Sequence, residues 1–224
     1  MSRALPIAVL CWLVTGHSAA APAGIVLDSF PSTPDPALRY AIYLHGRIVE
    51  DQGRHAVSKE LGAYDYDGIV KALARPGVAV IGELREKNAD PKVAAEHVVD
   101  GVKRLLAAGV PARNITVVGA SKGSLIAMLA STALPERDVG YVIMSNCNEW
   151  AADNFELSLH GRVLSIFEAS DEMAGTCGPL FEHSTALAGH DEIRLDTGLG
   201  HGYLYRPLKE WIEPAAAWIQ SRQK

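Results

Sequence analysis

The chain has 224 residues, of which 48% are hydrophobic, and it carries a formal net charge of -5 at pH 7. This length allows one well-buried core but is short for two. The acidic balance gives no electrostatic reason to expect nucleic acid or an anionic membrane as a partner.

The first segment has the layout of a secretory signal peptide. Arg3 precedes an apolar run over 4–15 and a stretch of small residues over 16–23, the order of the three regions of such a leader. We expect residues 1–20 to be removed and residues 21–224 to form a single exported domain, periplasmic or secreted. The apolar run is short for a membrane span, so no stable membrane insertion is expected after cleavage. A retained anchor is the alternative.

Strand-like and helix-like segments alternate after a proline-rich entry. Apolar runs predict strands over 39–44, 78–84, 115–118, 139–145, 163–169 and 193–196. Helical patterns predict helices over 57–73 (broken near Gly62), 91–108, 124–133 and 208–220. Of these, 91–108 has the clearest ends, with Pro91 at its start, Gly109 after it, and Val93 and His97 on its expected apolar stripe. The alternation predicts an α/β fold, a mostly parallel, doubly wound sheet with helices on both faces.

The most informative motif is Gly-Ala-Ser-Lys-Gly over 119–123. Its G-x-S-x-G pattern follows a β-branched strand and precedes a run of small and apolar residues, which is the context of a nucleophile elbow. Such a turn lifts the Ser121 hydroxyl above the sheet at a helix N-terminus, where developing negative charge is favoured. An ordinary strand-to-helix loop is the alternative interpretation.

Candidates for an acid and a base follow two later strands. Asp171 comes directly after the strand over 163–169, with Glu172 as the neighbour that could replace it. His201 lies among glycines after the last strand, where packing gives little reason for it. The carboxyl ends of parallel strands gather the reacting groups of open α/β sheets. The pattern therefore predicts Ser121 as nucleophile, His201 as general base and Asp171 as the group that orients the imidazole.

A tetrahedral intermediate also needs donors for its oxyanion. The backbone N–H of Lys122, next after the nucleophile, is one expected donor, and the backbone of Arg47, in the loop after the strand over 39–44, is the other. We expect His45, Gly46 and Arg85 to contact the substrate, with Gly46 allowing close approach. The basic side chains Arg47, Arg85, Lys87 and Lys122 could favour an anionic substrate or simply form solvated loop faces.

In the order Ser121, Asp171, His201, with His45-Gly46 after an early strand, the chain resembles the α/β-hydrolase superfamily. The resemblance extends from about Arg39 to the end and is closest to small, lidless, exported serine esterases. It implies the fold and an acyl-enzyme mechanism but no particular substrate. Lys122 is an unusual residue beside the nucleophile, and the insertion over 146–161 is too short for a substantial cap.

Two cysteines, Cys147 and Cys177, remain after removal of the leader. An even number in an oxidising compartment favours one disulfide, and both lie in loops expected at the carboxyl ends of neighbouring strands. Two free buried thiols are the alternative.

The sequence thus predicts a serine hydrolase that cleaves a small ester or thioester, with no cofactor and no metal. The alternatives are a peptidase or amidase with the same triad, and an inactive hydrolase-fold binding protein.

Overall fold

The structure is a computed structural model that describes residues 23–221. The predicted signal segment 1–20 lies outside these residues. Within residues 23–221, no helix combines the length and the apolar character needed to cross a bilayer.

Seven strands form one sheet in the order β1-β5-β2-β6-β7-β8-β9. Every neighbouring pair in it is parallel. The strands are β1 Ile25–Leu27, β2 Arg39–Leu44, β5 Val78–Ile81, β6 Ile115–Ala120, β7 Gly140–Met144, β8 Gly161–Glu168 and β9 Leu187–Leu195. The chain leaves β2 toward one edge and returns on its other side as β6, so the direction of winding changes between these two strands. Ligand sites of open α/β sheets lie at the carboxyl ends of such a pair.

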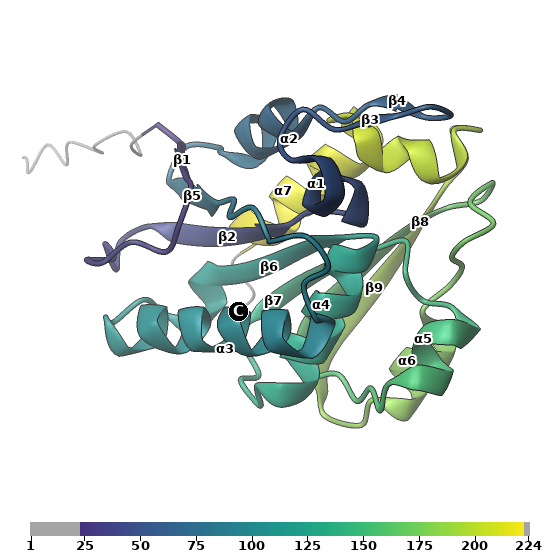
Figure 1. Cartoon of the computed structure of the whole chain (residues 1–224). Coiled ribbons are helices and arrows are strands. Elements are labelled where there is room, and N and C mark those ends of the chain that lie inside the picture. Colours follow the sequence, from purple (N-terminus) through teal and green to yellow (C-terminus); the bar gives the residue numbers. More distant parts are fainter. Residues whose placement is uncertain (1–22, 222–224) are drawn as a thin grey trace, which may run out of the picture.

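Helices cover both faces of the sheet, which confirms the predicted fold class (Figure 1). One face carries α1 Arg47–Gln52, α2 Tyr66–Leu73 and α7 Lys209–Gln220. The other carries α3 Pro91–Ala107, α4 Lys122–Ala133, α5 Glu149–Asn154 and α6 Gly178–His183. Alternate strand residues supply the two cores, as when Val117 faces α3 and α4 while Val118 faces α2 and α7.

Two expectations about secondary structure are wrong. The segment 57–73 is not one broken helix, because Val57–Ser58 (β3) and Gly62–Ala63 (β4) form a small antiparallel hairpin before α2. A positive φ of 81° at Gly62 makes the turn. The last strand begins at Leu187, well before the predicted 193. Hydrogen bonding to β8 extends this edge strand despite its polar residues.

The apolar stripe of α3 is rotated from its predicted position. Val98, Val102 and Leu105 are buried as expected, but Val93 is 63% exposed. His97 is also exposed and pairs with Glu83 at 2.6 Å instead of facing the core. The small residues Ala95 and Gly101 take the inward positions, because they allow α3 to approach its neighbours closely.

Candidate active site

Ser121 lies in the sharp turn between β6 and α4. Its φ of 53° and ψ of -120° are rare for a residue with a side chain and cost on the order of 1–3 kcal/mol. The flanking glycines are required sterically: a Cβ at Gly119 would overlap the backbone of Gly123, and a Cβ at Gly123 would overlap the Leu44 carbonyl. This is the strand, turn and helix that the sequence pattern predicts, and it holds the hydroxyl at the carboxyl edge of the sheet.

Three loops bring the predicted acid, base and nucleophile together. His201, in the short helical segment Gly200–Tyr205, has its Nε2 atom 3.0 Å from the Ser121 Oγ atom. Its Nδ1 atom is 2.8 Å from the Asp171 Oδ2 atom. Glu172, the alternative acid, is exposed to solvent. The geometry thus selects Asp171 as the partner of His201 and fits a proton transfer from Ser121.

The Asp171 carboxylate is fully buried and held by more than the histidine. The Ser145 hydroxyl donates to its Oδ2 atom at 2.6 Å, and the backbone N–H of Met173 donates to its Oδ1 atom at 3.0 Å. Burial alone would raise the pKa of Asp171, but the bonds from His201, Ser145 and Met173 outweigh it and hold the pKa below its usual value. The carboxylate is therefore ionised near neutral pH and oriented toward Nδ1. Ser145 was not predicted from the sequence, although a polar residue directly after a buried strand is a usable signal.

Glu168, the last residue of β8, forms hydrogen bonds with both the loop that carries Asp171 and the loop that carries His201. Its buried carboxylate accepts hydrogen bonds from the hydroxyls of Ser170 (2.9 Å) and Thr197 (2.7 Å) and from the backbone N–H of Thr197 (2.9 Å). Burial raises the pKa of Glu168, and these bonds more than reverse that effect, lowering it to about 2. Glu168 was not predicted from the sequence either, although an acid within an apolar strand calls for a buried partner.

Glu168 should make stability pH-dependent in acid. Because its folded-state pKa of about 2 lies below the ordinary 4.5, its contribution is complete above pH 4.5 and is lost as the pH falls toward 2. We expect Glu168→Gln to be less stable than wild type by about 1–3 kcal/mol at pH 7. The difference should shrink between pH 4.5 and 2, as measured by urea unfolding at stepped pH. A constant difference across this range would contradict the assignment.

The expected oxyanion donors lie at the starts of two helices that meet beside Ser121. Arg47 and Lys122 are the first residues of α1 and α4, and no side chain caps either helix. Their backbone N–H groups consequently have no acceptor within their helices. Gly46 passes so close that a Cβ on it would lie 3.6 Å from the Ser121 Cβ atom. This arrangement suits the predicted oxyanion hole, whose role stays a prediction.

His45 and Arg85, which we expected to contact the substrate, are bonded mainly to other protein groups. His45 is 0% exposed, and its Nε2 atom accepts from the backbone N–H of Arg85 at 3.0 Å. Burial, assisted by the charges of Arg85 and Lys122, lowers the pKa of His45 to about 3, so the ring is neutral. The Arg85 side chain is turned inward to Glu50 and to the His45 carbonyl. His45 therefore presents no surface to a ligand, whereas Arg85 lines the cavity beside α3 and Gly46 lies beside Ser121, so their substrate contacts stay predictions.

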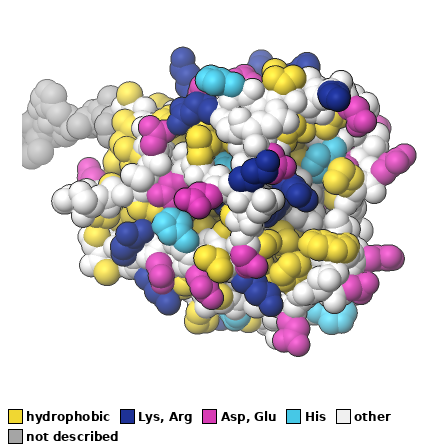
Figure 2. Space-filling view, viewed as in Figure 1, with side chains coloured by type: hydrophobic (Ala, Val, Ile, Leu, Met, Phe, Trp, Pro, Cys, Tyr) yellow, Lys and Arg dark blue, Asp and Glu magenta, His cyan; other side chains and the backbone are white. Residues whose placement is uncertain are grey.

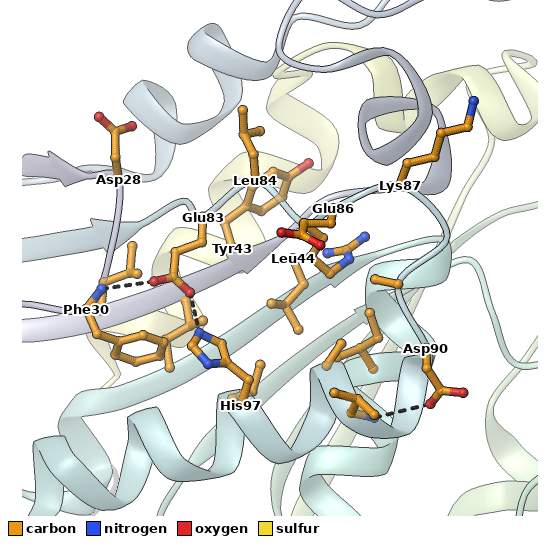
Figure 3. Close-up of a pocket in the computed structure, with 18 of the residues that line it drawn as sticks. Asp28, Phe30, Tyr43, Leu44, Glu83, Leu84, Glu86, Lys87, Asp90 and His97 are labelled. Atoms are coloured by element: carbon orange, nitrogen blue, oxygen red, sulfur yellow. Dashed lines mark hydrogen bonds and ion pairs between the residues drawn. The ribbon is translucent and has the colours of Figure 1, made fainter.

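Two cavities lie near the predicted triad. One, of about 720 Å³, lies between α3 and the loop after β5, and Figure 3 shows Glu83 on its wall bonded to Phe30 and His97. The other, of about 830 Å³, lies between α5 and α6. Neither is lined by Ser121 or His201. On the face drawn in Figure 2, acidic and basic side chains are interspersed, with no single large charged patch.

The predicted disulfide is confirmed: Cys147 and Cys177 are bonded, with their Cα atoms 5.1 Å apart. Cys147 follows Asn146, whose side-chain amide donates to the Ser121 carbonyl at 2.8 Å. The Cys147 carbonyl accepts from the backbone N–H of Gly175, in the loop that carries Asp171. The disulfide therefore links the two loops on one side of the predicted site.

Loss of the disulfide should destabilise the fold. The two cysteines are 30 residues apart in sequence, and closing a loop of that length in the unfolded chain is worth about 3–4 kcal/mol. We expect the double variant Cys147→Ser/Cys177→Ser to lose about that much free energy of unfolding in urea titrations. Added reductant should destabilise wild type and leave the variant unchanged. A reductant effect of equal size on both proteins would show that the disulfide is not its cause.

Within residues 23–221, no group of three or more histidine, cysteine, aspartate or glutamate side chains is arranged to hold a metal ion.

No protein-family model matches this sequence, and no curated protein matches it. Solved structures do match. ATU1826 from Agrobacterium tumefaciens, a protein of unknown function proposed to be an α/β-hydrolase, superposes with a TM-score of 0.59 at 14% identity, covering 90% of this chain and 88% of its own. The chain described by residues 23–221 therefore has the α/β-hydrolase fold.

Two further solved structures also match this chain. Est1E from Butyrivibrio proteoclasticus matches at 16% identity and a TM-score of 0.57, covering 85% of this chain and 90% of its own. The RedJ thioesterase of the prodiginine pathway in Streptomyces coelicolor matches at 13% identity and a TM-score of 0.54, covering 90% of this chain and 91% of its own. At such identities the likeness establishes the hydrolase fold, and the chemistry depends on the residues of the site.

Proposed function

We propose that the protein is a serine hydrolase that cleaves a small ester or thioester through an acyl-enzyme. The observation that carries the proposal is the hydrogen-bonded series Ser121, His201, Asp171, with separations of 3.0 and 2.8 Å, on a strained elbow. A serine hydroxyl is a weak nucleophile until an adjacent base takes its proton, and His201 Nε2 is placed to do this. The thioesterase among the structural neighbours supports the same reaction class.

In the proposed mechanism the Ser121 Oγ atom attacks the carbonyl carbon while its proton passes to His201 Nε2. Asp171 stabilises the imidazolium that forms, and the backbone N–H groups of Arg47 and Lys122 bind the oxyanion. Collapse breaks the bond to the leaving alcohol or thiol, which takes the proton from His201. Water, deprotonated by His201, then releases the acid and regenerates Ser121.

The shape and charge of the site support a small substrate. Ser121 and His201 line neither cavity, and α5, in the predicted cap position, has only six residues. Lys122 and Arg85, two of the basic residues that suggested an anionic substrate, are both bonded to Glu50. We therefore propose a small ester, which needs no deep acyl pocket; of the four basic residues only Arg47 and Lys87 remain exposed to contact an anionic group.

Export to the periplasm or the medium is part of the proposal. It is supported by the leader-like sequence over 1–20 and by the Cys147–Cys177 disulfide, which an oxidising compartment would maintain.

The test is a panel of p-nitrophenyl esters, thioesters and matched anilides offered to purified mature protein. We expect turnover of short-chain esters or thioesters and at least tenfold slower cleavage of the anilides. Faster anilide cleavage would favour the peptidase or amidase. No turnover, with no labelling by a fluorophosphonate, would favour the inactive binding protein.

A further inference from the structure

A buried glutamate close to the site is not used by the proposed mechanism. Glu50 is in α1, one turn after Arg47, and its side chain is 0% exposed. Its Oε1 atom is 2.5 Å from the Lys122 ammonium, and its Oε2 atom is 3.3 Å from the Nε atom of Arg85. A buried carboxylate is expensive to desolvate, so it persists where several partners hold it.

The partners of Glu50 come from two other segments, the start of α4 next to Ser121 and the loop after β5. Lys122 begins α4 and also donates to the Ala89 carbonyl at 2.7 Å, which fastens the loop after β5. Arg85, in that same loop, donates to the carbonyl of His45 through its guanidinium. One carboxylate thus joins α1, α4 and the loop after β5.

Both expected oxyanion donors are attached to this network. One is the backbone N–H of Lys122, whose own side chain binds Glu50. The other is the N–H of Arg47, which belongs to the same peptide unit as the Gly46 carbonyl. The neutral His45 ring accepts from Arg85 at Nε2, so its proton lies on Nδ1, which donates to that carbonyl at 2.9 Å. Because a peptide unit is planar, fixing the Gly46 carbonyl also fixes the direction of the Arg47 N–H.

We propose that Glu50 is a positioning residue that holds the two oxyanion donors, Arg47 N–H and Lys122 N–H, at the separation that the tetrahedral intermediate requires. The proposal rests on the proposed function. The network holds two cations against one carboxylate, and arginine stays protonated in proteins. Simple charge neutralisation therefore does not explain the arrangement, whereas the joining of three backbone segments does.

The first test is Glu50→Gln, which keeps the size of the side chain and removes its charge. Lys122 is 17% exposed and can turn to solvent when its partner is neutral. Displacing a donor by roughly 1 Å can cost about 100-fold in rate, so we expect kcat to fall about 10- to 100-fold with KM changed less than about threefold. Binding of a boronic acid, whose tetrahedral adduct occupies the same hole, should weaken by the same factor as kcat. Glu213→Gln, which removes an exposed partner of Arg75, is the matched control and should behave as wild type.

A second variant keeps the test decisive if Glu50→Gln folds poorly. Lys122→Met leaves the Glu50–Arg85 pair intact and retains the backbone N–H, yet removes the bond between α1 and α4. It should show the same pattern of lowered kcat, similar KM and weakened boronate binding. Rates are expressed per active serine, titrated with a fluorophosphonate, so that loss of folded protein does not imitate the effect.

Wild-type rates and boronate affinity per active serine in both variants would overturn the role of Glu50 while leaving the proposed function intact. The role would also be overturned if the variants contained fewer fluorophosphonate-reactive serines but kept the wild-type rate per active serine. A wild-type protein that neither turns over esters nor reacts with the fluorophosphonate would overturn the proposed function and this inference together.

Discussion

Ser121→Ala is expected to lower kcat for a short p-nitrophenyl ester by about four to six orders of magnitude. Without the hydroxyl no acyl-enzyme can form, and the bond that His201 Nε2 now makes at 3.0 Å has no partner. The backbone N–H groups would remain, so a small residual rate above that of buffer is expected. Initial rates at saturating ester, measured with freshly purified protein, check this result.

The matched control is Ser158→Ala, which removes an exposed serine on the loop before β8. It should retain the wild-type rate and melting temperature. A Ser121→Ala protein that folds and still hydrolyses the ester within tenfold of wild type would exclude Ser121 as the nucleophile, and the acyl-enzyme mechanism with it.

The second large effect is expected for Asp171→Asn, at about 10⁴-fold in kcat. The wild-type carboxylate accepts from Nδ1 of His201 at 2.8 Å, which leaves Nε2 free to take the proton of Ser121. An amide NH₂ in its place would donate to Nδ1 and move the ring proton to Nε2, where it blocks that transfer. The variant changes no side-chain volume, so a large loss of rate with little loss of folded protein is the expected signature.

Two controls distinguish this role of Asp171 from a general effect of removing one negative charge. Asp100→Asn, on the exposed side of α3, tests the same chemical change far from the site and should leave kcat unchanged. Glu172→Gln tests the alternative acid, which is exposed, and should also be nearly neutral. A large loss in Glu172→Gln with a normal Asp171→Asn protein would show that the wrong carboxylate has been assigned.

The sequence is most informative where structure is decided locally. The elbow at 119–123 was predictable because strand, glycines, serine and helix are contiguous, and the steric needs of the turn are met by neighbours in the chain. The start of α3 was similarly predictable, since Asp90 accepts from the backbone N–H groups of Lys92 and Val93 with Pro91 at the first turn. The position of Asp171 and His201 near Ser121 was predictable from the rule that the carboxyl ends of parallel strands meet at one edge of the sheet.

Features that depend on distant contacts were not predictable. The beginning of β9 has little strand propensity of its own and owes its conformation to pairing with β8. His45 follows a strand, as a substrate-binding residue would, and only the fold shows that Arg85, forty residues later, covers it. Glu50 reads in sequence as a charge on a short helix, because its bonds to Arg85 and Lys122 cross 35 and 72 residues.

Peptide mapping by mass spectrometry after fluorophosphonate treatment tests the central claim most directly, because it needs no knowledge of the substrate. We expect one adduct per chain, located on Ser121, with labelling abolished in Ser121→Ala and strongly slowed in His201→Ala. An adduct on another residue, or a folded wild-type protein that remains unmodified, would contradict the claim that Ser121 is an activated nucleophile.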